Sequence, residues 1–334
     1  MSDIRIYEDL DLTTPIGDGI FQIRLPMAGN PLRFVNGYLV EEDDGFTLID
    51  CGWRADDVLD ALVEGLRECG TTLECVRRLA ITHFHFDHYG LAGTLLRNGV
   101  PALLMHPLEW SFLQRIMTDP QAADRRADRW IERNGFYAES TLEDELQHGR
   151  TELIRPTREI GDGEHIGRLR AIWTPGHTAG HLCFHDAPSG RLFTGDHVLD
   201  PVTPHVGFWF EERGDPLGEY LSSLRKVDRI DAAGVLPAHG EPFADLHRRV
   251  AELLVHEESR EGRVVEALSR GPADAATIAR ALPWTRRNRT FEELSEAHRQ
   301  FAVSETISHL EHLRARGLVE RDATANPIRY VRLA

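Results

Sequence analysis

Four potential metal ligands lie within a six-residue stretch of the sequence. His83, His85, Asp87 and His88 follow directly after residues 78–82, an apolar segment typical of a buried strand. Imidazole and carboxylate groups together suit zinc or another first-row divalent ion. In an extended segment His83 and His85 point to the same side, so they can share one ion. Asp87 and His88 lie where the chain turns into a helix and face a second position, so the spacing indicates two metals.

An isolated polar residue in such a place has a simpler interpretation. A lone histidine is usually a satisfied polar group, and Asp87 alone could be the N-cap of a helix over residues 88–97. This interpretation fails for the whole cluster, because four such groups packed at a strand end without a metal would be buried without partners. The cluster therefore predicts metal binding.

Three later segments repeat the pattern of a strand followed by a tight turn with a polar residue. His177 follows Pro175-Gly176, Asp196 follows Gly195, and His239 lies in Pro237-Ala238-His239-Gly240. Each segment alone is a weak signal, because Pro-Gly-His and Gly-Asp occur in many loops. Together with the first motif, and in this order, they are specific.

With these motifs the chain resembles the metallo-β-lactamase superfamily. The matching residues span 50–240 and begin with Asp50. The resemblance implies an α/β fold, a four-layer αβ/βα sandwich over roughly residues 1–245. It also implies the ligand sets: His83, His85 and His177 for the first metal; Asp87, His88 and His239 for the second; and Asp196 as the bridging carboxylate.

The resemblance further implies hydrolysis. A glutamate in place of His85 would indicate a di-iron redox relative, whereas histidine favours the hydrolase branch. Two divalent ions, with zinc preferred, would lower the pKa of a bound water from 15.7 toward about 7 and supply hydroxide at neutral pH. Asp87 and Asp196 are the expected catalytic residues. Asp50 is expected to orient the ligand loop, with a turn carboxylate at the strand end as the alternative.

Two further histidines lie close to these motifs in the sequence. His181 opens a strand and could contact a ligand, and His197 could face the substrate. A structural role is an equal alternative for both.

The order of the predicted elements divides the chain into two domains. Residues 1–245 form the catalytic domain, with amphipathic helices inserted at about 107–150. Residues 246–334 form the second domain: a long helical pattern runs from about residue 243 to 269, helices follow over 273–282 and 303–316, and strands follow over 318–321 and 328–332. Helix, helix, helix, hairpin is the order of a winged helix, for which packing or homodimer formation is the predicted role.

The inserted helices could cover the site. In that arrangement Phe136 or Tyr137 would reach inward, and a small-molecule substrate would lie beneath the insertion. Phe208, Trp209 and Phe210 either line an apolar acyl-binding wall or pack against the inserted helices.

The winged-helix tail makes the chain similar to the lactamase-β-like-2 group in particular. That group is linked to single-strand RNA cleavage in animals and to acyl-carrier thioester hydrolysis in fungal polyketide pathways. The resemblance implies a hydrolase using a metal-bound hydroxide. We expect a thioester substrate of the acyl-CoA or acyl-carrier type, or a related ester or lactone. A single-strand-specific endoribonuclease is the alternative.

Charge favours the small-molecule substrate. The 38 Lys+Arg residues against 54 Asp+Glu residues give a net charge of −16, which argues against a general nucleic-acid binder. Between residues 251 and 334, 13 arginines balance 13 acids. The local basic cluster there, Arg286, Arg287 and Arg289 beside Trp284, is predicted to be a solvated loop.

Other sequence features favour a cytoplasmic protein. The four cysteines, Cys51, Cys69, Cys75 and Cys183, are too scattered for a disulfide framework. The first residues carry acids where a signal peptide would have a basic stretch. No apolar run approaches the roughly 18 residues needed to cross a bilayer, so no membrane partner is expected.

Overall fold

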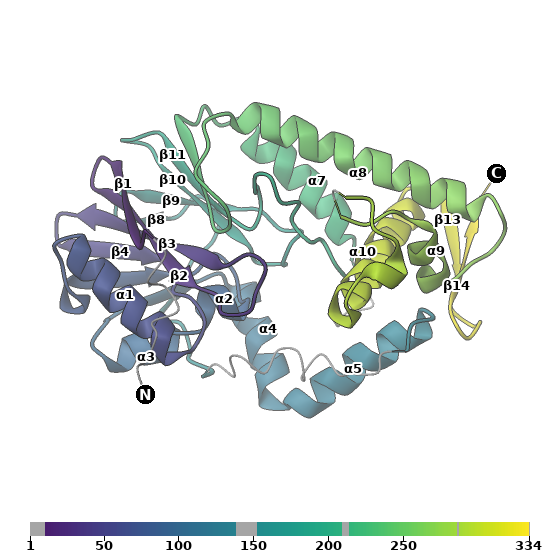
Figure 1. The fold of residues 1–334 in the computed structure, drawn as a ribbon, viewed down its shortest axis with the longest axis horizontal. Helices are drawn as coiled ribbons and strands as arrows, with labels where there is room; N and C mark the ends of the chain where they lie inside the picture. The colour runs from purple at the N-terminus through teal and green to yellow at the C-terminus, as the bar shows by residue number, and fades with distance from the viewer. Residues whose placement is uncertain (1–10, 138–151, 209–213, 286, 334) are drawn as a thin grey trace.

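Two β-sheets packed face to face form one half of the molecule, with helices on both outer faces, and the C-terminal elements form the other half (Figure 1). The computed structural model describes residues 11–137, 152–208, 214–285 and 287–333. Three apolar clusters fill the spaces between the layers: one lies between the first helices and the first sheet, one between the two sheets, and one between the second sheet and the later helices. The predicted α/β fold, a four-layer αβ/βα sandwich, is therefore confirmed.

The first sheet has seven strands in sequence order. Pairing is antiparallel from β1 to β4 and parallel from β4 to β7. The strands are β1 (Thr13–Gly17), β2 (Ile20–Pro26), β3 (Phe34–Glu42), β4 (Gly45–Ile49), β5 (Val76–Ala80), β6 (Leu103–Met105) and β7 (Arg158–Glu159). The strand expected over 152–160 is thus only two residues long.

The second sheet has five strands in the order β12-β11-β10-β9-β8. They are β8 (His165–Ile166), β9 (Leu169–Trp173), β10 (Leu182–Asp186), β11 (Arg191–Gly195) and β12 (Gly234–Pro237). Tyr38 of the first sheet meets Phe193 of the second edge to face, with ring centroids 5.3 Å apart. Apolar residues on both inner faces close the space between the sheets.

Helices with one apolar stripe cover the outer faces. In α1 (Asp56–Glu68) the buried residues recur at helical spacing, at Val58, Ala61, Leu62, Gly65 and Leu66. The short helices α2 (Phe86–Tyr89) and α3 (Ala92–Arg97) follow β5 on the same side, where Tyr89, Ala92 and Leu95 join the same apolar cluster as α1. On the opposite side α7 (Pro216–Val227) and the first half of α8 (Leu246–Leu268) pack on the second sheet.

The predicted insertion contains α4 (Pro107–Thr118) and α5 (Pro120–Arg133). Each helix begins with proline at its first position and a side-chain N-cap, His106 for α4 and Asp119 for α5. Figure 1 shows that α4 lies beside the sandwich, whereas α5 extends toward the C-terminal helices. Residues 138–150 of the predicted insertion lie outside the described residues.

The expectation that Phe136 or Tyr137 reaches into the site is wrong. Phe136 is buried in the C-terminal apolar cluster, where its ring meets Phe291 at 5.8 Å. Tyr137 is 67% exposed. Phe208 packs on Trp130 of α5 at 5.7 Å, so the packing alternative holds for this residue; Trp209 and Phe210 lie outside the described residues. The end of α5 and the residues just after it therefore pack against the C-terminal helices.

The C-terminal elements follow the predicted order. After α8 come α9 (Ala275–Ala281), α10 (Glu296–Ala315), β13 (Val319–Asp322) and β14 (Arg329–Arg332). Helix α10 begins seven residues before the expected start, because Ser295 caps its first turn. These elements share one apolar cluster of their own. The winged-helix assignment and the domain boundary at residue 245 remain predictions.

In the described part of the chain, no helix combines the length and apolar character needed to span a bilayer.

Candidate metal centre

All seven predicted ligands follow the ends of strands at one edge of the sandwich. The four residues of the first motif lie just beyond β5, where the chain turns into α2. His177 lies in the loop between β9 and β10, Asp196 directly after β11, and His239 two residues after β12. Because these strands end at the same edge, residues more than 150 positions apart in the chain converge.

Three imidazoles of the first predicted ligand set point their nitrogens at one another. His83 Nε2 lies 2.9 Å from His85 Nδ1. His177 Nε2 lies 3.2 Å from the His83 nitrogen and 3.1 Å from the His85 nitrogen. His83 and His177 are buried, which excludes bulk water as the partner of these atoms. Three nitrogens in such contact are suited to a shared cation.

The second predicted set gathers around Asp87. His239 Nε2 lies 3.2 Å, and His88 Nε2 3.5 Å, from Asp87 Oδ2. Asp196 stands between the two sets: Oδ2 is 3.6 Å from His177 Nε2, whereas Oδ1 is 3.5 Å from His239 Nε2 and 3.7 Å from His88 Nε2. Each oxygen of this carboxylate therefore faces a different group of ligands.

Hydrogen bonds at the far side of the rings fix which nitrogen is free to bind. His177 Nδ1 lies 2.7 Å from the His205 carbonyl, and His88 Nδ1 lies 2.8 Å from Asp50 Oδ2. An acceptor at Nδ1 holds the ring proton there and leaves a lone pair on Nε2. Within the described residues, the buried His88 Nε2 and Asp196 Oδ1 have no hydrogen-bond partner. These orphaned atoms and the N/O donor set fit a pair of divalent metal ions.

Asp50 supports the first motif from behind. Its side chain is 1% exposed and accepts hydrogen bonds from Thr82 N and Thr82 Oγ1, both at 2.8 Å, in addition to the His88 contact. Its φ of 57° is a left-handed conformation that aspartate tolerates better than most residues. The residue thus lies where the sequence predicted it, beside a ligand and behind the ligand loop.

The charges of the clustered carboxylates favour binding of a cation. Burial, and then the neighbouring imidazoles, hold the pKa of His83 well below its usual range, so its ring is in the neutral form that binds metals. Burial would also lower the pKa of His88, but Asp87, Asp196 and Asp50 raise it to about 10, so Nε2 binds a proton unless a metal ion takes the proton's place. Burial would raise the pKa of Asp87, yet His88 and His239 hold it below its usual range. The carboxylates therefore favour a cation beside them.

The two additional histidines occupy different positions. His181 is fully buried, and its Nε2 accepts a hydrogen bond from Asp196 N at 3.2 Å, so it contacts the backbone of a predicted ligand. His197 is also fully buried and meets Tyr220 of α7 edge to face at 5.3 Å. The expectation that His197 could face a substrate is wrong, because its ring is buried against Tyr220 of α7, the helix that packs on the second sheet.

Sequence reasoning missed two residues that contact the ligand loops. The backbone carbonyl of His205 orients His177, and Glu109 of α4 binds two ligand loops. No sequence signal marks the carbonyl. Glu109 is an acid in the first turn of a helix, a position where acids are common for reasons unrelated to function.

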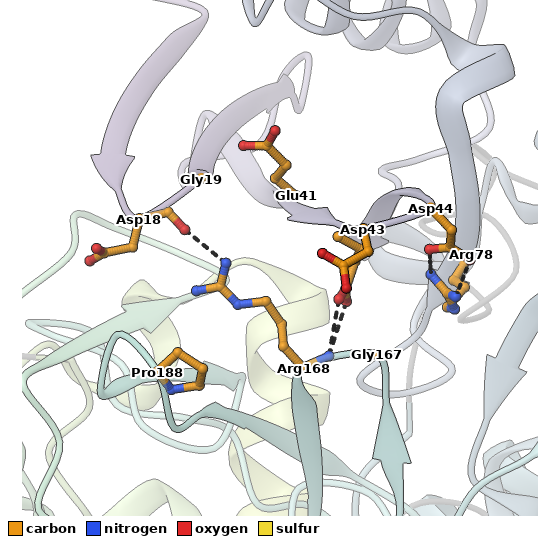
Figure 2. A pocket seen from close by; sticks show the side chains of 10 residues that line it. Asp18, Gly19, Glu41, Asp43, Asp44, Arg78, Gly167, Arg168 and Pro188 are labelled. Atoms are coloured by element: carbon orange, nitrogen blue, oxygen red, sulfur yellow. Dashed lines mark hydrogen bonds and ion pairs between the residues drawn. The ribbon is translucent and has the colours of Figure 1, made fainter.

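A separate hollow of about 1060 Å³ lies at the opposite end of the sandwich (Figure 2). Its lining includes Asp44, Arg168 and Pro188, which precede β4, β9 and β11, whereas the candidate metal centre follows the other ends of these strands. Arg168 donates to Asp18 O, and Arg78 donates to Asp44. The hollow is therefore distinct from the metal centre.

Comparison with known proteins decides the family. The sequence profile of the metallo-beta-lactamase superfamily matches residues 30–239, which contain every predicted ligand. The chain belongs to the metallo-beta-lactamase superfamily.

Curated relatives of this superfamily member come from fungi and bacteria. Lactamase-like protein adaB of Aspergillus niger is 30% identical over 253 residues, 74% of this chain and 64% of the relative. Probable metallo-hydrolase YqjP of Bacillus subtilis is 26% identical over 294 residues, 83% of this chain and 87% of the relative. An atrochrysone carboxyl ACP thioesterase of Aspergillus terreus is 27% identical over 255 residues, 75% of this chain and 63% of the relative. The chain thus spans slightly less than two thirds of the length of these fungal relatives.

Solved structures of the superfamily match nearly the whole chain. A metallo-beta-lactamase family protein from Thermus thermophilus is 31% identical with a TM-score of 0.81, covering 96% of this chain and 100% of that one. A beta-lactamase domain protein from Burkholderia ambifaria is 28% identical with a TM-score of 0.81, covering 96% and 93%. The likeness therefore extends into the C-terminal elements.

Proposed function

We propose that this chain hydrolyses a thioester with two divalent metal ions, zinc being the preferred pair, held by the seven predicted ligands. The observation that carries the proposal is the convergence of two ligand groups, each with its atoms within 4.8 Å of one another. Imidazole and carboxylate donors of this kind suit zinc. The first ion would be held by His83, His85 and His177, the second by Asp87, His88 and His239, with Asp196 between them.

The chemistry of hydrolysis follows from the residues around this centre. Two divalent ions held here would lower the pKa of a water molecule and stabilise negative charge on a carbonyl oxygen. Asp196, with one oxygen toward each ligand group, fixes the spacing between the two positions. Asp87 Oδ2 lies 3.2 Å from His239 Nε2, so these two donor atoms of the second group are already close together. The water oxygen bonds to the acyl carbon, the carbon–sulfur bond breaks, and the departing sulfur takes one proton of the water, which gives a carboxylic acid and a thiol.

An apolar surface beside the ligands supports an acyl substrate. Phe84, which lies between two ligands, packs on His85 at 4.7 Å and on Phe112 of α4 at 4.4 Å. Both phenylalanines are partly exposed. Arg115 lies over the Phe112 ring at 5.0 Å and could accompany the anionic part of a carrier. The thioesterase name of the Aspergillus terreus relative favours the same substrate class.

The endoribonuclease alternative has less support from the tail. In α10 the polar residues His309 and Glu311 are buried, so they are unavailable to phosphates. Arg287 and Arg289 are exposed, as expected of a solvated loop. The net charge of −16 further disfavours long polyanions.

A direct comparison of the two substrate classes tests the proposal. The zinc-loaded protein would be assayed against a panel of acyl-CoA and acyl-carrier thioesters and against single-stranded RNA, with His85→Ala as the matched inactive variant. We expect thioester turnover that RNA does not inhibit and that His85→Ala abolishes. RNA cleavage that is lost in His85→Ala, with affinity that falls steeply with salt and no thioester turnover, would overturn the substrate assignment.

A further inference from the structure

Glu109 is a buried carboxylate on the inserted helix α4 that belongs to neither predicted ligand set. Glu109 is 1% exposed and lies in the first turn of the helix. The start of the helix is fixed by Pro107 and by the His106 cap, whose Nδ1 accepts from Leu108 N at 3.2 Å. A buried carboxylate is costly unless hydrogen bonds compensate it, so its partners indicate what it does.

Those partners belong to two different ligand loops. Glu109 Oε2 accepts from Phe84 N at 2.7 Å, and Phe84 stands between the ligands His83 and His85. Glu109 Oε1 accepts from Gly180 N at 2.5 Å, in the loop that carries His177. One carboxylate therefore connects the two loops whose three nitrogens converge in the first ligand group.

The contact with the second loop is tight. A Cβ at Gly180 would lie 2.7 Å from His106 Nδ1 and 2.8 Å from Glu109 Oε1, so only glycine allows this approach. Trp173 strengthens the same junction: its ring stacks on His106 at 5.5 Å, and its Nε1 donates to Ala179 O at 2.9 Å. The loop is held against α4 from two sides.

We infer that Glu109 is a positioning residue that sets the distance between His83 and His85 on one loop and His177 on the other. The first helix of the insertion thereby serves the metal centre, while the second helix packs on the C-terminal elements. The inference rests on the proposed function, because it concerns the geometry of a metal group. It assigns Glu109 no contact with substrate or metal.

The isosteric substitution Glu109→Gln separates positioning from simple space filling. A carboxamide has one acceptor oxygen, so in either orientation its NH₂ group faces a backbone N–H of one loop. Loss of such an outer partner typically costs 10–100-fold in metal affinity. The effect should be confined to the first ligand group, because the second group has no bond to this carboxylate among the described contacts.

The test measures Co²⁺ affinity by competition with a chromophoric chelator, together with the d–d absorption spectrum, in single-site backgrounds. In Asp87→Asn, which disables the second group, we expect Glu109→Gln to weaken Co²⁺ binding about 10–100-fold and to shift the spectrum. In His177→Ala, which disables the first group, the same substitution should leave affinity unchanged. Glu132→Gln, at an exposed acid on α5, is the matched control.

The outcomes distinguish this inference from the proposed function. If the unsubstituted protein binds no Co²⁺, the proposed metal centre is wrong. If it binds two ions and Glu109→Gln lowers only the melting temperature, with affinity and spectrum unchanged, Glu109 is merely structural and the inference is overturned. If Glu109→Gln does not fold, Glu109→Asp, which keeps the charge but is one methylene shorter, provides the same comparison.

Discussion

Replacing Asp50 by asparagine tests whether the residues behind the ligands control metal binding. The carboxylate accepts three hydrogen bonds of 2.8 Å, from Thr82 N, Thr82 Oγ1 and His88 Nδ1. Asparagine has the same size but only one acceptor oxygen. With that oxygen toward His88, its NH₂ opposes the Thr82 backbone N–H; with the oxygen reversed, its NH₂ donates to His88 Nδ1. In the second orientation the ring proton moves to Nε2, which can then no longer bind a metal.

The expected size of the effect follows from these bonds. A buried donor left without a partner costs about 1–3 kcal/mol of stability, which Asp50→Asn should show in the metal-free protein. Loss of a partner that orients a ligand weakens metal binding about 10–100-fold, equivalent to roughly 1.4–2.7 kcal/mol. The affinity should fall for the ion held by Asp87, His88 and His239.

Stepwise Zn²⁺ affinities measured by chelator competition, with denaturant unfolding of the metal-free protein, provide the assay. Asp43→Asn is the matched control, because Asp43 is exposed in the turn at the opposite end of β4. Wild-type affinity for both ions in Asp50→Asn would refute the reasoning, since it would mean that the tautomer of His88 does not depend on its partner.

Two further substitutions test other parts of the account. Asp196→Ala should abolish turnover, because its carboxylate holds the two ligand groups together. The circular dichroism spectrum should stay unchanged, because this residue, 8% exposed, lies at the end of a strand. Retained turnover would contradict the role of Asp196. In Glu305 of α10, burial would raise the pKa, but the charge of Arg260 and the hydrogen bond from His205 lower it to about 2. A carboxylate whose pKa is lowered in the folded state stabilises the fold at pH values above its unfolded pKa of about 4.5, and this stabilisation is lost as the pH falls toward 2. Above pH 5 the free energy of unfolding of the wild type should therefore exceed that of Glu305→Gln by on the order of 3 kcal/mol. Unfolding of the metal-free proteins across pH 2–7 checks this, and a pH-independent difference would contradict it.

The sequence was sufficient to predict the strand ends that carry the site. Each ligand motif follows an apolar run short enough to be a buried strand, and the family resemblance implies that the ends of these strands meet. The predicted position of Asp50 followed from the same reasoning, because it closes the strand that lies next to β5. These inferences depend only on local patterns and on the family resemblance.

Packing between distant segments could not be predicted in this way. An amphipathic pattern shows that a helix has an apolar face but not which surface covers it, so the pattern allows Phe136 to reach the site, whereas the ring packs on Phe291. His197 looks polar in the sequence, yet the second sheet and Tyr220 bury it. Glu109 was missed because its partners are backbone N–H groups, which any residue type supplies.

The most direct test of the central claim is anomalous diffraction from crystals of the zinc-loaded protein, collected at the metal absorption edge. We expect two metal peaks per chain, one among His83, His85 and His177 and the other among Asp87, His88 and His239, with Asp196 between them. No peak, or peaks away from these residues, would contradict it.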